Sequence, residues 1–239
     1  MHLASLVEDL RKKLRAGGSE ERAINAKAYL KSDLEFYGVP SKRLRAAVRD
    51  LLTDNPDLEK TDLKELVATL WQDPVFDMRG AAIAVLERRQ RELDASDLEL
   101  VESLLRSSYT WALVDWISTK VVAPVVSREP VAKDRLRRWS GDDDFWVRRA
   151  AMLSLLPDLR AGGGDFDLFA SFAVSMLEEK EFFIRKAIGW VLRDTSRRRP
   201  ELVAGFVREH RCRMSPLTYR EATRNLPPKL REALDVCSK

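Results

Sequence analysis

The sequence is poor in the residues that bind metals or form disulfides. It contains two cysteines, Cys212 and Cys237, and two histidines, His2 and His210, among 239 residues. No set of these residues has the spacing of a metal site, so we expect no metal. A disulfide is not required by this content, which fits a reducing cytoplasm. We therefore expect a cytoplasmic protein in which Cys212 is an ordinary thiol.

Long apolar runs are also missing. No stretch approaches the roughly 18 consecutive apolar residues of a membrane helix. The N-terminus has no basic segment followed by an apolar one, so we expect neither a signal peptide nor any contact with a membrane. The alternating pattern and turn residues of paired strands are absent as well. With 45% hydrophobic and 33% charged residues, the composition is typical of a soluble folded protein.

The net charge is modest, because the sequence has 42 Lys and Arg residues and 38 Asp and Glu residues. Total charge therefore does not indicate a nucleic-acid partner, although clusters such as Arg135–Arg138 and Arg197–Arg199 suit phosphate contact. Each cluster, taken alone, is more simply explained as a solvated helix face or end.

What the sequence does contain is helical periodicity along nearly its whole length. Leu6, Leu10 and Leu14 recur at helical spacing, and a helix is predicted over 20–34 with Ala23, Ala26 and Leu30 facing inward. Ser41 is predicted to cap the next helix, and 96–99 (Ser-Asp-Leu-Glu) to form a capping box. The β-branched run 121–126 is interpreted as a buried helix despite Pro124.

A repeat is superimposed on this pattern. Five segments share an apolar or aromatic residue, an arginine, a variable residue and an alanine: Leu44–Ala47, Met78–Ala81, Val147–Ala150, Ile184–Ala187 and Tyr219–Ala222. Their arginines are 34, 69, 37 and 35 residues apart. The step of 69 spans two repeats, which places a degenerate copy beside Asp115. We therefore predict one all-α domain over 1–239, an α-solenoid of about six HEAT-like helix pairs whose second helices form a concave face.

The variable residues form one column of the predicted solenoid: Ala46, Gly80, Asp115, Arg149, Lys186 and Glu221. Asp115, Arg149 and Lys186 should therefore lie close together, with Trp111 one turn before Asp115 and Trp190 one turn after Lys186. A tryptophan and an aspartate on one helix are most simply core and cap residues. A column of residues that faces another helix should be apolar. The charges in this column therefore favour a functional strip over a purely structural role.

Other recurring residues have structural interpretations. Arg45, Arg79, Arg148, Arg185 and Arg220 occupy the same repeat position, so we expect them to pair with acidic residues or carbonyls between repeats, with phosphate contact as the alternative. Four more tryptophans are expected in the core or between repeats: Trp71, Trp116, Trp139 and Trp146.

Four segments resemble the AlkD-like HEAT-repeat DNA glycosylases: Tyr29–Val39, Trp111–Asp115, Trp146–Met152 and Glu181–Arg193. The resemblance extends over about residues 5–225, and the last segment is the most specific. It implies a catalytic aspartate at Asp115, sugar-facing tryptophans at Trp111 and Trp190, and an essential arginine at Arg149. It also implies a wall residue at Tyr29. Thr110 and Ala112 depart from the family, which often has a second Trp and an Asp at these two places.

The resemblance implies a monomeric DNA repair enzyme that excises positively charged N3- or N7-alkylated purines from duplex DNA without base flipping. Asp115 would stabilise the oxocarbenium-like transition state or position water, and no cofactor is implied. DNA contacts are expected from Arg149, Lys186, Arg148 and Tyr29. The alternatives are a catalytically inert HEAT-repeat protein that binds damaged or branched DNA, and a protein scaffold. A scaffold should have an apolar concave strip, which the charged column does not provide.

Overall fold

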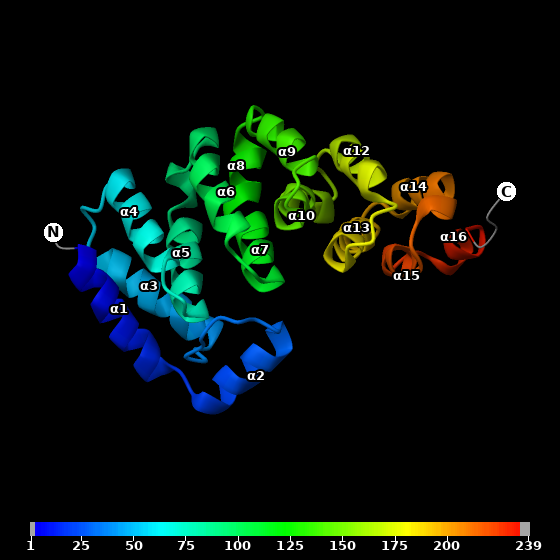
Figure 1. The fold of residues 1–239 in the computed structure, drawn as a ribbon. Helices are drawn as coiled ribbons and strands as arrows, with labels where there is room; N and C mark the ends of the chain where they lie inside the picture. Colours follow the sequence, from blue (N-terminus) through cyan, green and yellow to red (C-terminus); the bar gives the residue numbers. More distant parts are fainter. Residues whose placement is uncertain (1–2, 235–239) are drawn as a thin grey trace.

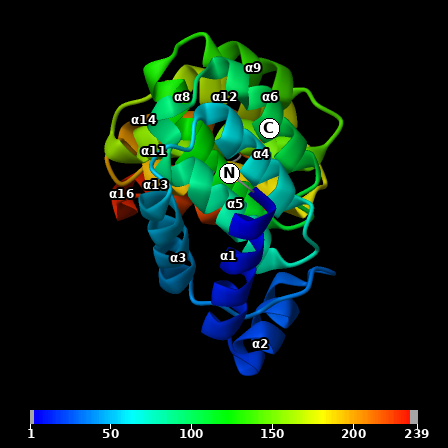
Figure 2. The same cartoon turned by 90° about the vertical axis from the view of Figure 1, so that its left-hand side faces the viewer.

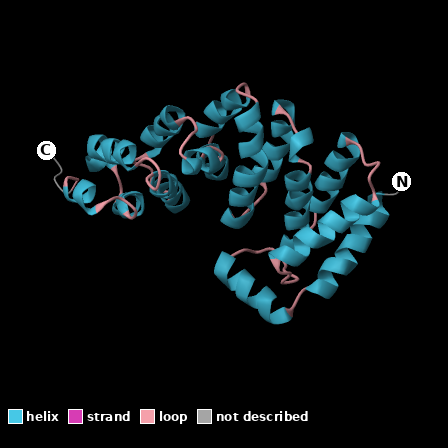
Figure 3. Cartoon of the chain, turned by 180° about the vertical axis from the view of Figure 1, so that it is seen from behind, coloured by secondary structure: helices cyan, strands magenta, loops and turns pink. Residues whose placement is uncertain are grey.

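The computed structural model describes residues 3–234, which form two stacked rows of helices that curve along their length (Figure 1). Within these residues the only β-type pairing is an isolated bridge between Glu35 and Val75, and Figure 3 shows helices and loops alone. The all-α prediction is confirmed.

Six helix pairs account for most of the solenoid. The first helices are α1 Leu3–Gly17, α4 Lys60–Trp71, α6 Leu98–Arg106, α9 Ala132–Ser140, α12 Phe166–Met176 and α14 Pro200–His210. The second helices, called the inner helices below, are α3 Ser41–Asp54, α5 Phe76–Arg88, α7 Trp111–Ile117, α10 Phe145–Leu153, α13 Phe182–Thr195 and α15 Pro216–Thr223. Each inner helix packs against the next one along the chain, as the repeat predicted.

Four further helices lie between or after the paired ones. α2 Glu20–Leu30 lies between α1 and α3, α8 Ala123–Arg128 between α7 and α9, and α11 Leu156–Ala161 between α10 and α12, while α16 Pro228–Glu232 follows α15. Three 3₁₀ turns and a π-helical segment, Ser118–Val122, complete the helical structure of the described residues. The π segment and α8 contain the β-branched run around Pro124, and Val121, Val122, Val125 and Val126 are all buried. The interpretation of 121–126 as buried helix is therefore confirmed.

The core follows the helical spacing of the apolar residues. In α6 the buried residues are Leu98, Val101, Leu104 and Leu105, which lie on one face at i, i+3, i+6 and i+7. Buried apolar residues form one cluster from Val7 to Leu234. The arginines at the shared repeat position, Arg45, Arg79, Arg148, Arg185 and Arg220, are called the ladder arginines below. Three of them donate a hydrogen bond to the backbone carbonyl six residues earlier: Arg79 to Asp73, Arg148 to Asp142 and Arg185 to Glu179. Each of these arginines thus fixes the turn that precedes its own helix.

Helix α2 differs from the other long helices because none of its residues is fully buried. Ala23, Ala26 and Leu30 are its half-buried residues, as predicted. The helix ends at Leu30 rather than at 34, because Lys31 adopts a left-handed conformation with φ 48°. Figure 2 shows α2 at the bottom of the view, below α1 and α3.

The loop after α2 is tied to the start of α5. The buried carboxylate of Asp77 accepts backbone N–H groups of Tyr37 at 2.8 Å and Val39 at 2.9 Å. Gly38 has φ +75°, and a Cβ there would collide with the backbone of Ser19. Only glycine allows this close crossing, which fixes where α2 starts and therefore where its far end lies.

Three local predictions are wrong. Ser41 is the first residue of α3, and the cap position is Pro40, without a side-chain cap. The capping box before α6 uses Asp94 and Asp97, since the chain forms a 3₁₀ turn at 95–97 before the α-helix starts. Cys212 is disulfide-bonded rather than an ordinary thiol, and Cys237 lies outside the described residues.

No helix within residues 3–234 is both long and apolar enough to cross a membrane.

Candidate active site

Helix α7 presents Trp111 and Asp115 on one face because the opposite face is anchored in the core. Leu113, Val114 and Ile117 are buried, and they hold the short helix against its neighbours. Since Trp111 and Asp115 are four residues apart, they are adjacent on the remaining face. The core side of α7 therefore determines where the carboxylate points.

The carboxylate of Asp115 is held by the next inner helix. Arg149 on α10 donates from Nε to Oδ1 at 2.7 Å and from Nη2 to Oδ2 at 2.9 Å. Its Nη1 donates to the carbonyl oxygen of Phe183 at 2.5 Å. Arg149 is only 3% exposed. A two-pronged charge-assisted contact of this kind fixes the plane of the carboxylate as well as its position.

Asp115, with a side chain 13% exposed, opens onto a pocket of about 380 Å³. The pocket is lined by Tyr29, Trp111, Asp115, Arg149, Phe182, Phe183, Lys186, Trp190, Arg193 and Glu221. We call it the Asp115 pocket. It collects side chains from α2, α7, α10, α13 and α15, so only the folded solenoid brings them together.

The two ends of the Asp115 pocket are electrostatically different. Burial raises the pKa of Asp115, and the hydrogen bonds and charge of Arg149 oppose that rise. At the other end, the ammonium of Lys186 donates to Glu221 at 2.7 Å, and Arg193 contacts the same carboxylate. The indole of Trp190 lies on the same side and donates to Asp194 at 3.1 Å.

Six of the seven predicted site residues line the Asp115 pocket: Tyr29, Trp111, Asp115, Arg149, Lys186 and Trp190. Tyr29 reaches it from α2, and its ring meets that of Trp111 edge-on at 5.7 Å between centroids. The guanidinium of Arg149 binds Asp115 and Phe183, and its expected contact with a DNA phosphate stays a prediction.

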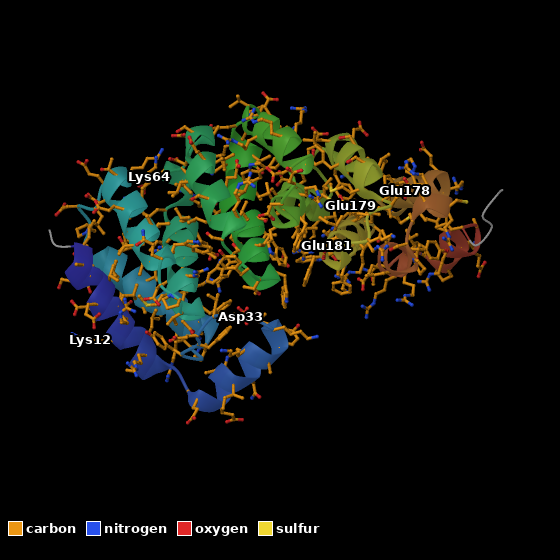
Figure 4. All side chains as sticks on the ribbon, in the orientation of Figure 1. Lys12, Asp33, Lys64, Glu178, Glu179 and Glu181 are labelled. Carbon is orange, nitrogen blue, oxygen red and sulfur yellow. The ribbon has the colours of Figure 1, made fainter. Side chains whose placement is uncertain are left out.

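Arg148 is the predicted residue that lies elsewhere. It donates to the carbonyls of Asp142 and Asp143 and forms an ion pair with Glu179. Glu179 lies in the turn between α12 and α13, beside Glu181, and both are labelled in Figure 4. Arg148 is therefore a ladder residue, as its repeat position indicated. Within the described residues, no cluster of three or more His, Cys, Asp and Glu side chains could hold a metal ion.

Sequence reasoning did not single out Phe182 and Phe183, which line the Asp115 pocket. A signal was available in the repeat. The position three residues before the ladder arginine is aromatic in α5, α10 and α13, and the matching position of the degenerate repeat is Trp111.

The fold and this pocket define a HEAT-like solenoid with a buried carboxylate between aromatic walls. The sequence matches the family model of the DNA alkylation repair enzymes over residues 10–226. The chain belongs to that family.

Solved structures share the helical-repeat fold. A protein of Enterococcus faecalis, described as a predicted DNA alkylation repair enzyme, has a TM-score of 0.80 at 24% identity, covering 88% of this chain and 97% of that one. AlkD2 from Streptococcus mutans has a TM-score of 0.64 at 16% identity, covering 94% and 99%. The alkylpurine DNA glycosylase AlkC of Pseudomonas fluorescens, bound to DNA with an abasic-site analogue, has a TM-score of 0.51 at 18% identity, covering 93% and 60%. No curated protein matches the sequence.

Proposed function

We propose that this protein is a DNA glycosylase that excises positively charged N3- or N7-alkylated purines from duplex DNA. The observation that carries the proposal is the Asp115 carboxylate, which Arg149 holds in a solvent-open pocket beside Trp111 and across from Trp190. Its DNA partner is supported by the family and by the DNA complex of the AlkC relative. A single chain supplies every residue of the pocket, so we propose a monomer.

The chemistry of the substrate explains what such a pocket must do. An alkylated purine with a formal positive charge is a good leaving group, so protonation of the base is not needed. Breaking the glycosidic bond places positive charge on the deoxyribose. A fixed carboxylate stabilises that charge, or orients the attacking water, without reorganising during the reaction.

The side chains around Asp115 have matching roles. The indole faces of Trp111 and Trp190 attract a cationic sugar or base, each contributing about 0.5–2 kcal/mol. Arg149 keeps the carboxylate in one orientation, a positioning role. Excision of a base that stays in or near the stack is what the resemblance to the AlkD-like glycosylases implies for this pocket.

The proposed enzyme is monofunctional and hydrolytic. A Schiff-base mechanism needs a neutral amine, and Lys186, the lysine that lines the pocket, forms an ion pair with Glu221. We therefore expect an intact abasic site as product, with no strand cleavage by the protein.

The test is base release from a duplex that carries one N7-methylguanine, and from alkylated DNA rich in N3-methyladenine. Wild-type protein should release the modified base and leave an alkali-labile abasic site, whereas Asp115→Asn should bind the same duplex without releasing it. Tight, salt-dependent binding without release from either substrate would instead favour the catalytically inert DNA-binding protein. Absence of binding at low salt would contradict both.

A further inference from the structure

A second concavity adjoins the Asp115 pocket and is walled mainly by aromatic rings. It has a volume of about 530 Å³ and is lined by Tyr29, Leu30, Lys31, Tyr109, Thr110, Trp111, Trp146, Phe182 and Phe183. We call it the aromatic groove. Six of its nine lining residues are aromatic, and four of them line the Asp115 pocket as well. The two hollows are therefore continuous.

The rings of the aromatic groove are unusually open to solvent. Tyr29 is 73% exposed, Tyr109 65% and Phe182 52%. These are the exposed large aromatic residues among residues 3–234, and all three line this one groove. Single exposed apolar residues are ordinary, but a gathered set marks a surface that binds something.

The backbone of the groove is constrained in the same place. Lys31 has φ 48° and Tyr109 has φ 55°, and they are the non-glycine residues with positive φ in the described chain. Residues with Cβ atoms rarely adopt this conformation, and such residues gather at binding sites, where the surrounding fold holds them. Here Tyr109 lies in the turn between α6 and α7.

Thr110 adds an unpaired polar group. It occupies the cap position of α7, where a threonine side chain normally accepts an N–H of the first turn, yet its side chain makes no such bond. Its Oγ1 is buried without a partner, and the residue is 2% exposed. Buried hydroxyl groups are nearly always hydrogen-bonded. Thr110 lines the groove, so a bound molecule that displaces the side chains covering this hydroxyl would supply the missing partner.

We propose that the aromatic groove binds a nucleobase that has left the duplex stack beside the damaged nucleotide. This inference rests on the proposed function, because the groove continues from the Asp115 pocket. Flat aromatic walls stack on the faces of any base. The hydroxyl of Thr110 can donate to or accept from the base edge, and exposed Lys31 places a positive charge at the rim for a phosphate.

The experiment uses the full chain and a duplex with a stable abasic-site analogue facing a single unpaired 2-aminopurine. Binding of the wild type should quench the fluorescence of that base as it stacks on the rings. Tyr109→Asn removes a ring that lines only the groove, and asparagine tolerates the left-handed backbone. This change should abolish most of the quenching and weaken binding at least about fivefold. Affinity for a fully paired duplex should stay within about twofold.

Two further variants make the result specific. Thr110→Val keeps the shape of the side chain but removes its hydroxyl, so binding of the unpaired-base duplex should weaken about two- to tenfold while quenching persists. Val131→Ser alters an apolar residue that is 63% exposed outside both hollows, and should change neither signal.

The outcomes separate the two proposals. A wild type that releases alkylated bases but does not quench 2-aminopurine would overturn the nucleobase assignment and leave the glycosylase intact. Equal quenching by wild type and Tyr109→Asn would overturn it too. A wild type that binds none of these duplexes would overturn the proposed function itself, and a peptide partner would then fit the groove better.

Discussion

Two ion pairs line the Asp115 pocket from successive positions of the same column, yet their surroundings differ. Asp115 pairs with Arg149, and both side chains are largely buried; Lys186 pairs with Glu221, and the lysine is 40% exposed. The order of charges is reversed, since the carboxylate comes from the earlier repeat in the first pair and from the later repeat in the second. Repeat register therefore brings opposite charges together, but does not determine what they do.

The pKa values of the two carboxylates move in opposite directions. Burial raises the pKa of Asp115, and its one cation offsets this only in part. Burial also acts on Glu221, but the hydrogen bond and charge of Lys186, with the charges of Arg193 and Arg224, hold its pKa below the ordinary value. Asp115, which is paired with one buried cation, can therefore still attract a new positive charge strongly, whereas Glu221, which is surrounded by cations, cannot.

The largest expected difference is catalytic. Asp115→Asn should lower the rate of base release by about 10²–10³-fold, the usual effect of removing one preorganised electrostatic group. Glu221→Gln is the matched change at the other pair and should lower it less than about tenfold. Single-turnover release of N7-methylguanine measures both rates. Equal losses would mean that pocket integrity, rather than the environment of Asp115, controls the reaction.

The next largest difference between the two ion pairs should be their contribution to the free energy of unfolding. Arg149→Met leaves an uncompensated buried carboxylate, so the free energy of unfolding should fall by about 3–5 kcal/mol. Lys186→Met breaks a partly exposed pair and should cost about 0–1 kcal/mol. Urea denaturation followed by circular dichroism gives both values. In the double variant Asp115→Asn, Arg149→Met much of the loss should be recovered, since the lone charge is gone.

The sequence predicted the solenoid and the strip of charged residues because both depend on a period. A step of about 34 residues was visible in the arginines and alanines, and the same register placed Asp115, Arg149 and Lys186 on one wall. Local ends were predicted less well. The end of α2 at Leu30 depends on the left-handed Lys31, and that residue type gives no sign of such a conformation.

The role of Arg149 shows a second limit. Its position in the column was predicted, but a column does not show which neighbour a guanidinium prefers, and the structure pairs it with Asp115. The aromatic groove was missed because Tyr109 and Phe182 come from different turns. Their exposure is a tertiary property, and aromatic residues in a helical sequence are normally assigned to the core.

The pH dependence of the excision rate should distinguish Asp115 from Glu221. The proposed mechanism needs ionised Asp115, so the excision rate should fall as pH drops through a pKa that burial raises above the ordinary 3.8. Glu221→Gln should leave this acid limb in place, because the pKa of Glu221 lies below its ordinary 4.5. Arg149→Lys should move the limb, since it alters the cation that opposes the rise. A profile of single-turnover rate against pH, with DNA integrity as control, tests this.

The pKa shifts of Asp115 and Glu221 also make the free energy of unfolding depend on pH, in opposite directions. The raised pKa of Asp115 favours the folded state at pH below the unfolded pKa, and this contribution is lost as pH rises through the folded pKa. The lowered pKa of Glu221 contributes above the unfolded pKa and is lost as pH falls through the folded one. The difference in unfolding free energy between Glu221→Gln and wild type should therefore shrink in acid.

The smallest effect concerns Tyr29, the wall residue that contacts Trp111. Tyr29 comes from α2, a helix without fully buried residues, and its ring meets Trp111 edge-on. Such an aromatic pair is worth about 0.5–1.5 kcal/mol, so Tyr29→Ser should lower kcat/KM for excision about two- to tenfold and leave the urea midpoint unchanged. Ile24→Ser, an exposed change on the same helix, is the control. Equal loss of activity in both variants would mean that α2 acts through its placement over the pocket. Loss in Tyr29→Ser alone would mean that the tyrosine ring itself keeps Trp111 beside the carboxylate of Asp115. The Asp115 pocket would then depend on a helix that contributes little to the core.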